Sequence, residues 1–138
     1  MSKKLTIVKV GGKIVEEATS LNSFLDLFAA VEGPKVLIHG GGRTATAMAM
    51  RLGIETQMVG GRRVTDEAML RVVTMVYGGL VNKNVVAALS GRGVKALGLT
   101  GADLDVMRSH RRSAGVVDYG FVGDVDHTDG EMLKVLIE

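Results

Sequence analysis

Two glycine-rich turns hold the residues of this sequence whose types and spacing could do chemistry. Lys9 stands one residue before the end of an apolar run, and Gly11 and Gly12 follow that run. Further along, the apolar residues 36–38 lead into His39 and the glycines 40–42, where a helical pattern begins at once. Because the first N–H groups of a helix have no internal acceptor and carry partial positive charge, such a turn can bind a carboxylate or a phosphate.

Together the two turns suit the transfer of a phosphoryl group. They offer one ammonium and two sets of backbone donors, and such catalysis consists mostly of positioning and charge stabilisation. Open α/β sheets bind ligands at the carboxyl ends of their strands, so Lys9 and the glycines 40–42 would share one edge. The spacing of a Walker A loop is missing. Two plainer interpretations stay open: a lysine on an edge strand, and tight strand-to-helix turns that bind no ligand.

A pair of arginines forms the third candidate. Arg62 and Arg63 come directly before a helix start near Thr65. An arginine at such a position can hold a carboxylate with its planar fork. An ordinary solvated surface pair is the commoner explanation of two adjacent arginines, and it also stays open. The aspartates between positions 103 and 129 are better explained by turns and caps than by Mg²⁺, so we predict no metal ligand among these residues.

Composition argues against several classes of function. The length of 138 residues fits one domain spanning 1–138, and 46% hydrophobic residues can form a real core. Aromatic residues make up only 4% and the net charge is +2, which argues against a nucleic-acid partner. The absence of cysteine fits a reducing cytoplasm, and the N-terminal residues show no signal-peptide pattern. No apolar run approaches the roughly 20 residues of a membrane helix, so no membrane partner is expected.

Strands that alternate with helices must position the candidate residues. Local patterns predict buried strands over residues 5–10, 36–38 and 94–99, and helices over 21–31, 45–52 and 65–89. The last of these helices would use the Thr65 hydroxyl as its N-cap, and a close helix neighbour would explain its interior glycines, Gly78 and Gly79. The alternation implies an α/β fold, a three-layer αβα sandwich with a mainly parallel central sheet.

The remaining segments are shorter. Residues 55–59 are expected to be extended, and residues 60–64 to form a loop before the long helix. Towards the C-terminal end, residues 106–108 and 116–117 would pair as strands, residues 121–125 would add another strand, and a helix would begin at position 128.

The order and spacing of these segments resemble those of the acetylglutamate kinases, within the amino-acid kinase family. The matching segments are Lys9-Val-Gly-Gly12, His39-Gly-Gly-Gly42, Gly61-Arg-Arg-Val-Thr65-Asp66, Val81-Asn82-Lys83 and Gly120-Phe-Val-Gly-Asp124. The two glycine turns alone would fit several sister kinases, whereas the Gly-x-Arg-Val-Thr segment is more specific. The similarity covers essentially the whole chain.

The resemblance implies a reaction and roles for individual residues. The reaction is the phosphorylation, by ATP with Mg²⁺, of the side-chain carboxylate of N-acetyl-L-glutamate, a step in arginine synthesis. Lys9 would stabilise the transferring phosphoryl group, and Arg63 rather than Arg62 would hold the α-carboxylate of the substrate. The long helix would form a homodimer. The implied backbone contacts are Gly11 and Gly12 to the phosphoryl group, and Gly41 and Gly42 to the reacting carboxylate.

Members of this family are nearly twice as long as this chain. Their second half supplies most of the ATP site and a second catalytic lysine, so this chain resembles the N-terminal, acylglutamate-binding half, and by itself it is not expected to transfer a phosphoryl group. Two alternatives stay open. One is another kinase of the same fold, acting on glutamate, aspartate, carbamate or a nucleotide. The other is a small-molecule binding or assembly module without catalysis.

Overall fold

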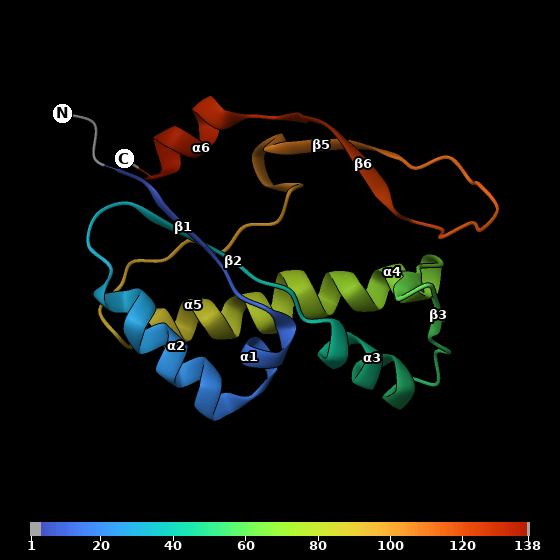
Figure 1. Ribbon diagram of the computed structural model, residues 1–138, viewed down its shortest axis with the longest axis horizontal. Helices are drawn as coiled ribbons and strands as arrows, with labels where there is room; N and C mark the ends of the chain where they lie inside the picture. Colours follow the sequence, from blue (N-terminus) through green and yellow to red (C-terminus); the bar gives the residue numbers. More distant parts are fainter. Residues whose placement is uncertain (1–3, 138) are drawn as a thin grey trace.

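A parallel pair of strands lies at the centre of the protein. The computed structural model describes residues 4–137 (Figure 1). Strand β1 (Thr6–Lys9) pairs with β2 (Lys35–Ile38), with Lys9 opposite Ile38 at the carboxyl end. The pairing continues for one more bond, because the Val10 N–H donates to the Ile38 carbonyl at 2.9 Å. Both predicted strands are confirmed, with ends that differ by at most one residue from the predicted ones.

Helices α1 to α5 lie on one side of these strands, and α6 lies with the hairpin β5–β6 on the other (Figure 1). The helical elements are α1 (Gly12–Glu16), α2 (Ala18–Ala30), α3 (Gly42–Arg51), α4 (Glu67–Val73), the π-helical η1 (Thr74–Val81), α5 (Asn82–Ser90), the 3₁₀ turn η2 (Asp103–Asp105) and α6 (Gly130–Ile137). Two core clusters meet at Phe24 of α2 and Leu37 of β2, which pack against both.

One continuous helical run, α4–η1–α5, contributes to both clusters. Met69, Val72 and Val76 are buried in the first, and Val85 and Leu89 in the second. The predicted extent of the helix, to about residue 89, is therefore confirmed. The run of 24 residues is also long and apolar enough to cross a membrane, so the expectation that no apolar run reaches that length is wrong. A buried core helix meets the same test of length and composition.

The N-cap of this helix is Asp66 and not Thr65. The Asp66 side chain accepts a hydrogen bond from the Met69 N–H at 2.8 Å. Thr65 cannot take that role, because its backbone is already paired: its N–H donates to the Tyr119 carbonyl and its carbonyl accepts from the Phe121 N–H. This contact keeps Thr65 extended, so the helix begins one residue later.

The predicted strand at residues 94–99 is not formed in the described part of the chain. Val94 and Ala96 pack against the second core cluster, as alternate side chains of a strand would. The carbonyls of Gly98 and Leu99, however, accept from side chains of α5, Lys83 Nζ at 3.0 Å and Asn82 Nδ2 at 3.2 Å. Side-chain donors thus take acceptors that a neighbouring strand would otherwise use.

Two antiparallel hairpins complete the fold. The segment predicted as a loop is part of a hairpin between β3 (Gln57–Val59) and β4 (Arg62–Val64). Strand β5 (Met107–Arg111) pairs with β6 (Gly123–Thr128), so the predicted partner at residues 116–117 is wrong. Arg112 follows β5 and donates to Asp124 of β6 at 2.9 Å, which holds the pKa of that carboxyl below its usual value. The last strand and helix exist close to their predicted places, with α6 starting at Gly130.

Two methionines on the long helix test this packing. Met69 is 1% exposed and Met75 is 54% exposed. Met69→Ala should lower the free energy of unfolding by about 2–5 kcal/mol, because it leaves a cavity in the core. Met75→Ala should change it by less than about 0.5 kcal/mol. Urea denaturation followed by circular dichroism measures both, and equal losses would contradict the assignment of the two helix faces.

Candidate functional site

The second glycine turn joins β2 to α3. Gly41 is the N-cap of α3 and Gly42 is its first residue. A Cβ atom on Gly41 would lie 3.1 Å from both the Tyr77 ring and Val81 Cγ2, so the close approach of the long helix favours glycine at this position. The first N–H groups of α3 have no acceptor within the helix and remain free for a ligand unless another group takes them.

Arg63 reaches this turn from the β3–β4 hairpin. Its Nη2 donates to the Gly42 carbonyl at 2.8 Å and to Thr46 Oγ1 at 2.7 Å, and its Nη1 donates to the Tyr77 hydroxyl at 3.2 Å. Its Nε is buried and has no partner within residues 4–137. The structure therefore brings Arg63 and Gly42, which are 21 positions apart in sequence, into direct contact.

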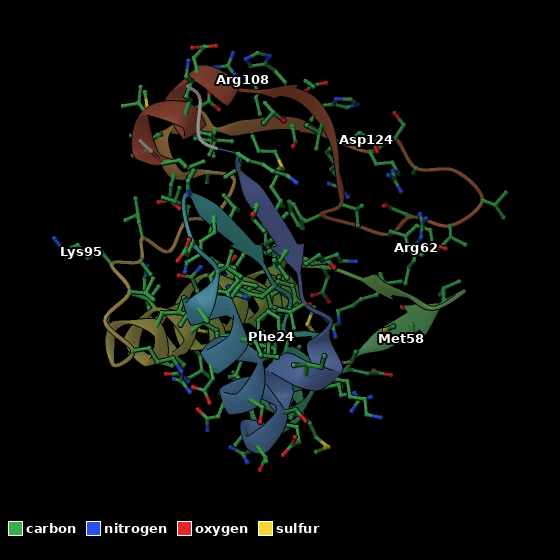
Figure 2. The ribbon with its side chains drawn as sticks, turned by 60° about the vertical axis from the view of Figure 1, so that its left-hand side comes forward. Phe24, Met58, Arg62, Lys95, Arg108 and Asp124 are labelled. Carbon is green, nitrogen blue, oxygen red and sulfur yellow. The ribbon has the colours of Figure 1, made fainter. Side chains whose placement is uncertain are left out.

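Arg62 points the other way. It is exposed and lines a small hollow of about 380 Å³ with Arg112, Tyr119 and other residues of the loop that leads into β6 (Figure 2). The two arginines separate because they are neighbours on a β-strand, where successive side chains alternate between faces. Only Arg63 is placed at the glycine turn.

The turn of this hairpin explains why the arginines take these positions. Gly60 and Gly61 both have positive φ angles, 56° and 77°, which a two-residue hairpin turn requires and which L side chains rarely adopt. Two glycines between short extended runs are a recognised hairpin signal, so a hairpin was predictable where a loop is expected above.

The first glycine turn lies at the same edge of the central strands. Lys9 is exposed at the end of β1, and within the described chain its ammonium has no hydrogen bond or ion pair. Gly11 is the N-cap of α1, and a Cβ atom there would meet nothing within 4 Å. The parallel register of β1 and β2 thus places Lys9 and both glycine turns at neighbouring strand ends.

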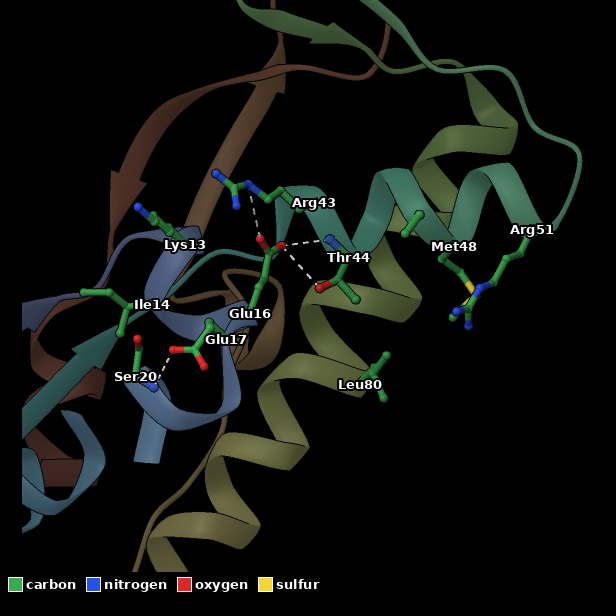
Figure 3. A pocket seen from close by; sticks show the side chains of 11 residues that line it. Lys13, Ile14, Glu16, Glu17, Ser20, Arg43, Thr44, Met48, Arg51 and Leu80 are labelled. Carbon is green, nitrogen blue, oxygen red and sulfur yellow. Dashed lines mark hydrogen bonds and ion pairs between the residues drawn. The ribbon is translucent and has the colours of Figure 1, made fainter. Parts of the chain in front are cut away.

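Glu16 is a residue of this region that the sequence analysis missed. Its Oε1 accepts from the Thr44 N–H at 2.8 Å and from the Thr44 hydroxyl at 3.2 Å (Figure 3). It thereby links α1, which follows the first turn, to α3, which follows the second. The local pattern offers only a glutamate one helical turn after Gly12, and nothing in it indicates a partner 28 positions away.

A groove of about 850 Å³ opens beside Glu16, between α1 and α3 (Figure 3). It does not include Lys9, Gly41, Gly42 or Arg63, so this groove is not the predicted site. Its lining residues are Lys13, Ile14, Glu16, Glu17, Ser20, Arg43, Thr44, Ala47, Met48, Arg51 and Leu80. Among the residues that the structure describes, no group of three acidic, histidine or cysteine side chains could hold a metal ion.

Comparison with known proteins identifies the family. The model of the Amino acid kinase family matches residues 4–138. The chain belongs to the amino acid kinase family. It is 64% identical over 137 residues to the acetylglutamate kinase of Bacteroides fragilis, covering 99% of this chain and 52% of that protein. It is 38% identical to the acetylglutamate kinase of Methanopyrus kandleri, covering 97% and 53%.

Solved structures support the α/β fold of this family member. The smu.665 protein of Streptococcus mutans matches with a TM-score of 0.75 at 22% identity, over 96% of this chain and 54% of that one. The N-acetylglutamate synthase of Neisseria gonorrhoeae, solved with coenzyme A and N-acetyl-glutamate, matches with a TM-score of 0.74 at 24% identity, over 96% and 31%. The expected fold is thus confirmed. The chain spans about half the length of the curated relatives it matches.

The two adjacent arginines give a matched test of this geometry. Arg63→Lys should lower the free energy of unfolding by about 1–3 kcal/mol, because one ammonium cannot serve the Gly42, Thr46 and Tyr77 oxygens as a planar fork does. Arg62→Lys should change it by less than about 0.5 kcal/mol. Chemical denaturation of both variants measures the difference, and a larger loss for Arg62→Lys would show that the wrong arginine is assigned to the turn.

Proposed function

We propose that this chain is the acylglutamate-binding part of an acetylglutamate kinase of the cytoplasm. The complete enzyme would transfer the γ-phosphoryl group of ATP to the side-chain carboxylate of N-acetyl-L-glutamate, in arginine synthesis. The observation that carries the proposal is the meeting of Lys9 and two glycine turns at one edge of the β1–β2 pair. The choice of substrate is supported by the names of relatives that are 64% and 63% identical to the chain.

The chemistry divides between the two turns. At the second turn, the backbone N–H groups of Gly41 and Gly42 would bind the reacting carboxylate and orient one oxygen towards phosphorus. At the first turn, Lys9 and the N–H groups of Gly11 and Gly12 would stabilise charge on the transferring group. The new bond joins the carboxylate oxygen to the γ-phosphorus, the bond from that phosphorus to the β,γ-bridging oxygen breaks, and ADP leaves.

Arg63 would hold the α-carboxylate of the substrate. Both hydrogens of Nη2 are engaged, on the Gly42 carbonyl and the Thr46 hydroxyl, while Nη1 has one engaged hydrogen and Nε has none. A bidentate contact of Nη1 and Nη2 with the substrate carboxylate therefore requires Arg63 to release one of its hydrogen bonds at the start of α3. Binding of substrate would in this way be coupled to the position of that helix.

The site fits a phosphoryl group better than a metal ion. Gly11 is open to close approach, and Lys9, two residues before it, is exposed. Because residues 4–137 offer no cluster of three metal ligands, Mg²⁺ would be held here by the phosphates of the nucleotide, which it usually accompanies. When bound, Mg²⁺ would neutralise phosphate charge, and the chain's own contribution would be Lys9 and the backbone.

The complete enzyme would form a homodimer through the outer face of the long helix. Met75 lies on this helix and is 54% exposed. Apolar side chains on an uncovered helix face favour packing against a second copy.

The role of Lys9 can be tested in the full-length product of the gene. Lys9→Ala should lower kcat by about 100-fold or more with a much smaller change in KM, because the charge is needed mainly in the transition state. Lys4→Ala changes an exposed lysine just before the same strand and should leave kcat unchanged. Steady-state assays of ADP release with N-acetyl-L-glutamate compare the variants, and a near-normal kcat for Lys9→Ala would refute the assignment.

The chain of 138 residues permits a second test of the proposal. It holds the Gly41, Gly42 and Arg63 contacts, so it should bind N-acetyl-L-glutamate, but weakly, since each absent bond to a charged group costs about 1.5–3 kcal/mol. Phosphoryl transfer should be absent, because one lysine does not neutralise the charge of ATP. Titration calorimetry and an ADP-release assay measure the two properties. Turnover above background would contradict the description of this chain as a binding part.

A further inference from the structure

Glu16 is a charged side chain that is almost fully buried. Its side chain is only 9% exposed, and its Oε2 has no hydrogen-bond partner within the described residues. Burial of a carboxylate is costly unless hydrogen bonds compensate for the lost water. Among residues 4–137, Thr44 supplies all of the compensating hydrogen bonds, and Arg43 Nε lies 3.9 Å from Oε2. The free-energy cost of burying this carboxylate indicates that Glu16 has a specific structural role.

That role is to cap the N-terminus of α3 with a side chain that belongs to a different helix, α1. Thr44 is the third residue of α3, and its N–H is one of those that helix geometry leaves without an acceptor. The residue at the N-cap position, Gly41, has no side chain and makes no capping bond. Glu16 supplies the missing acceptor from another helix, so Gly41 can stay a glycine and leave the turn open.

The Glu16 carboxylate also lies close to the first turn. A Cβ atom built on Gly12 would lie 3.7 Å from Glu16 Oε2, so the carboxylate sits directly beside that turn. The same carboxylate bonds to the helix that starts at Gly42. One side chain of α1 therefore links the helix that begins at the first turn to the helix that begins at the second.

We propose that Glu16 is a positioning residue for the phosphoryl transfer argued above. It sets the separation between Gly11–Gly12 and Gly41–Gly42. By occupying the Thr44 N–H, it also confines an anionic ligand to the N–H groups at the very start of α3. The inference rests on the proposed function for its catalytic consequence, but the capping bond itself can be measured without catalysis.

Glu17 provides a matched control. It is the next residue, it is also a glutamate, and it also caps a helix: its carboxylate accepts from the N–H groups of Thr19 at 3.0 Å and Ser20 at 2.7 Å. Those residues belong to its own helix, α2, and Glu17 is exposed. Its loss removes a cap of similar strength and leaves the link between the two turns intact.

The catalytic test compares Glu16→Ala, Glu16→Gln and Glu17→Ala in the full-length product, at a temperature well below the melting point of each variant. A displacement of about 1 Å at reacting atoms can cost about 100-fold in rate, so Glu16→Ala should lower kcat by about 10–100-fold. Glu16→Gln keeps the side-chain length and the acceptor oxygen and should stay within about threefold of the unchanged protein. Glu17→Ala should leave kcat unchanged although its melting temperature falls.

Each other outcome overturns the inference. Equal kcat values for Glu16→Ala and Glu17→Ala would mean that Glu16 only stabilises the fold. A kcat for Glu16→Gln as low as that for Glu16→Ala would mean that charge, and not position, is what Glu16 contributes. If the unchanged full-length protein does not phosphorylate N-acetyl-L-glutamate at all, the proposed function fails first.

Hydrogen exchange on the 138-residue chain then tests the link by itself. Glu16→Ala should speed exchange of the Thr44 amide by at least about tenfold, whereas Glu17→Ala should leave it unchanged. Equal exchange of that amide in both variants would show that Glu16 does not hold α3, whatever the reaction.

Discussion

The parallel pairing of β1 with β2 is the contact on which the rest of the structure depends. Each strand ends in a glycine turn and feeds a helix, and the register that sets Lys9 opposite Ile38 places both turns at one edge. Parallel strands end together only if a crossover returns the chain to the same side, and α2 is that crossover. Its Phe24, Leu25 and Phe28 pack in the core clusters, so the burial of α2 holds the two turns together.

The long helix contributes to the site through its π-helical segment. Within η1, Val76 is buried in the core, while Tyr77 lies against Gly41 and accepts a hydrogen bond from Arg63. π-helical turns shift side chains relative to a regular helix and are frequent at functional sites. The expected close helix neighbour of the interior glycines is wrong for the described residues: a Cβ atom on Gly78 would lie 3.1 Å from Thr100 Cγ2, and one on Gly79 would meet nothing within 4 Å. The neighbour of Gly78 is a loop and not a helix.

Elements with a local signal could be predicted from the sequence, and elements defined by distant partners could not. The strands β1 and β2 and helix α3 follow from apolar runs and glycines, which act over a few residues. The start of α4 was missed by one residue because the backbone of Thr65 pairs with residues 119 and 121. Residues 94–99 have the composition of a strand, but side chains of α5 take their carbonyls.

The candidate site divides in the same way. Lys9 and the glycines could be identified from their residue types and spacing. The choice of Arg63 over Arg62 came from a resemblance, because two adjacent arginines cannot be told apart by local sequence alone. What separates them in space is the alternation of β4, which follows from the turn at Gly60. Glu16 had no local signal at all, since its task is defined by Thr44, 28 positions later.

The exposure of Lys9 limits what its charge can do in this chain. Val8 faces the core, so Ile7 and Lys9 lie on the opposite face of the strand, where Ile7 is 61% exposed and neighbouring Ile38 is 49% exposed. Two unit charges 4 Å apart interact by about 1 kcal/mol in water but by about 4 kcal/mol at an effective dielectric constant of 20. The stabilisation that phosphoryl transfer would need from Lys9 therefore requires this apolar face to be covered and dry. Under the proposed function, a chain that holds the two glycine turns but leaves that face in water would bind substrate without transferring the phosphoryl group.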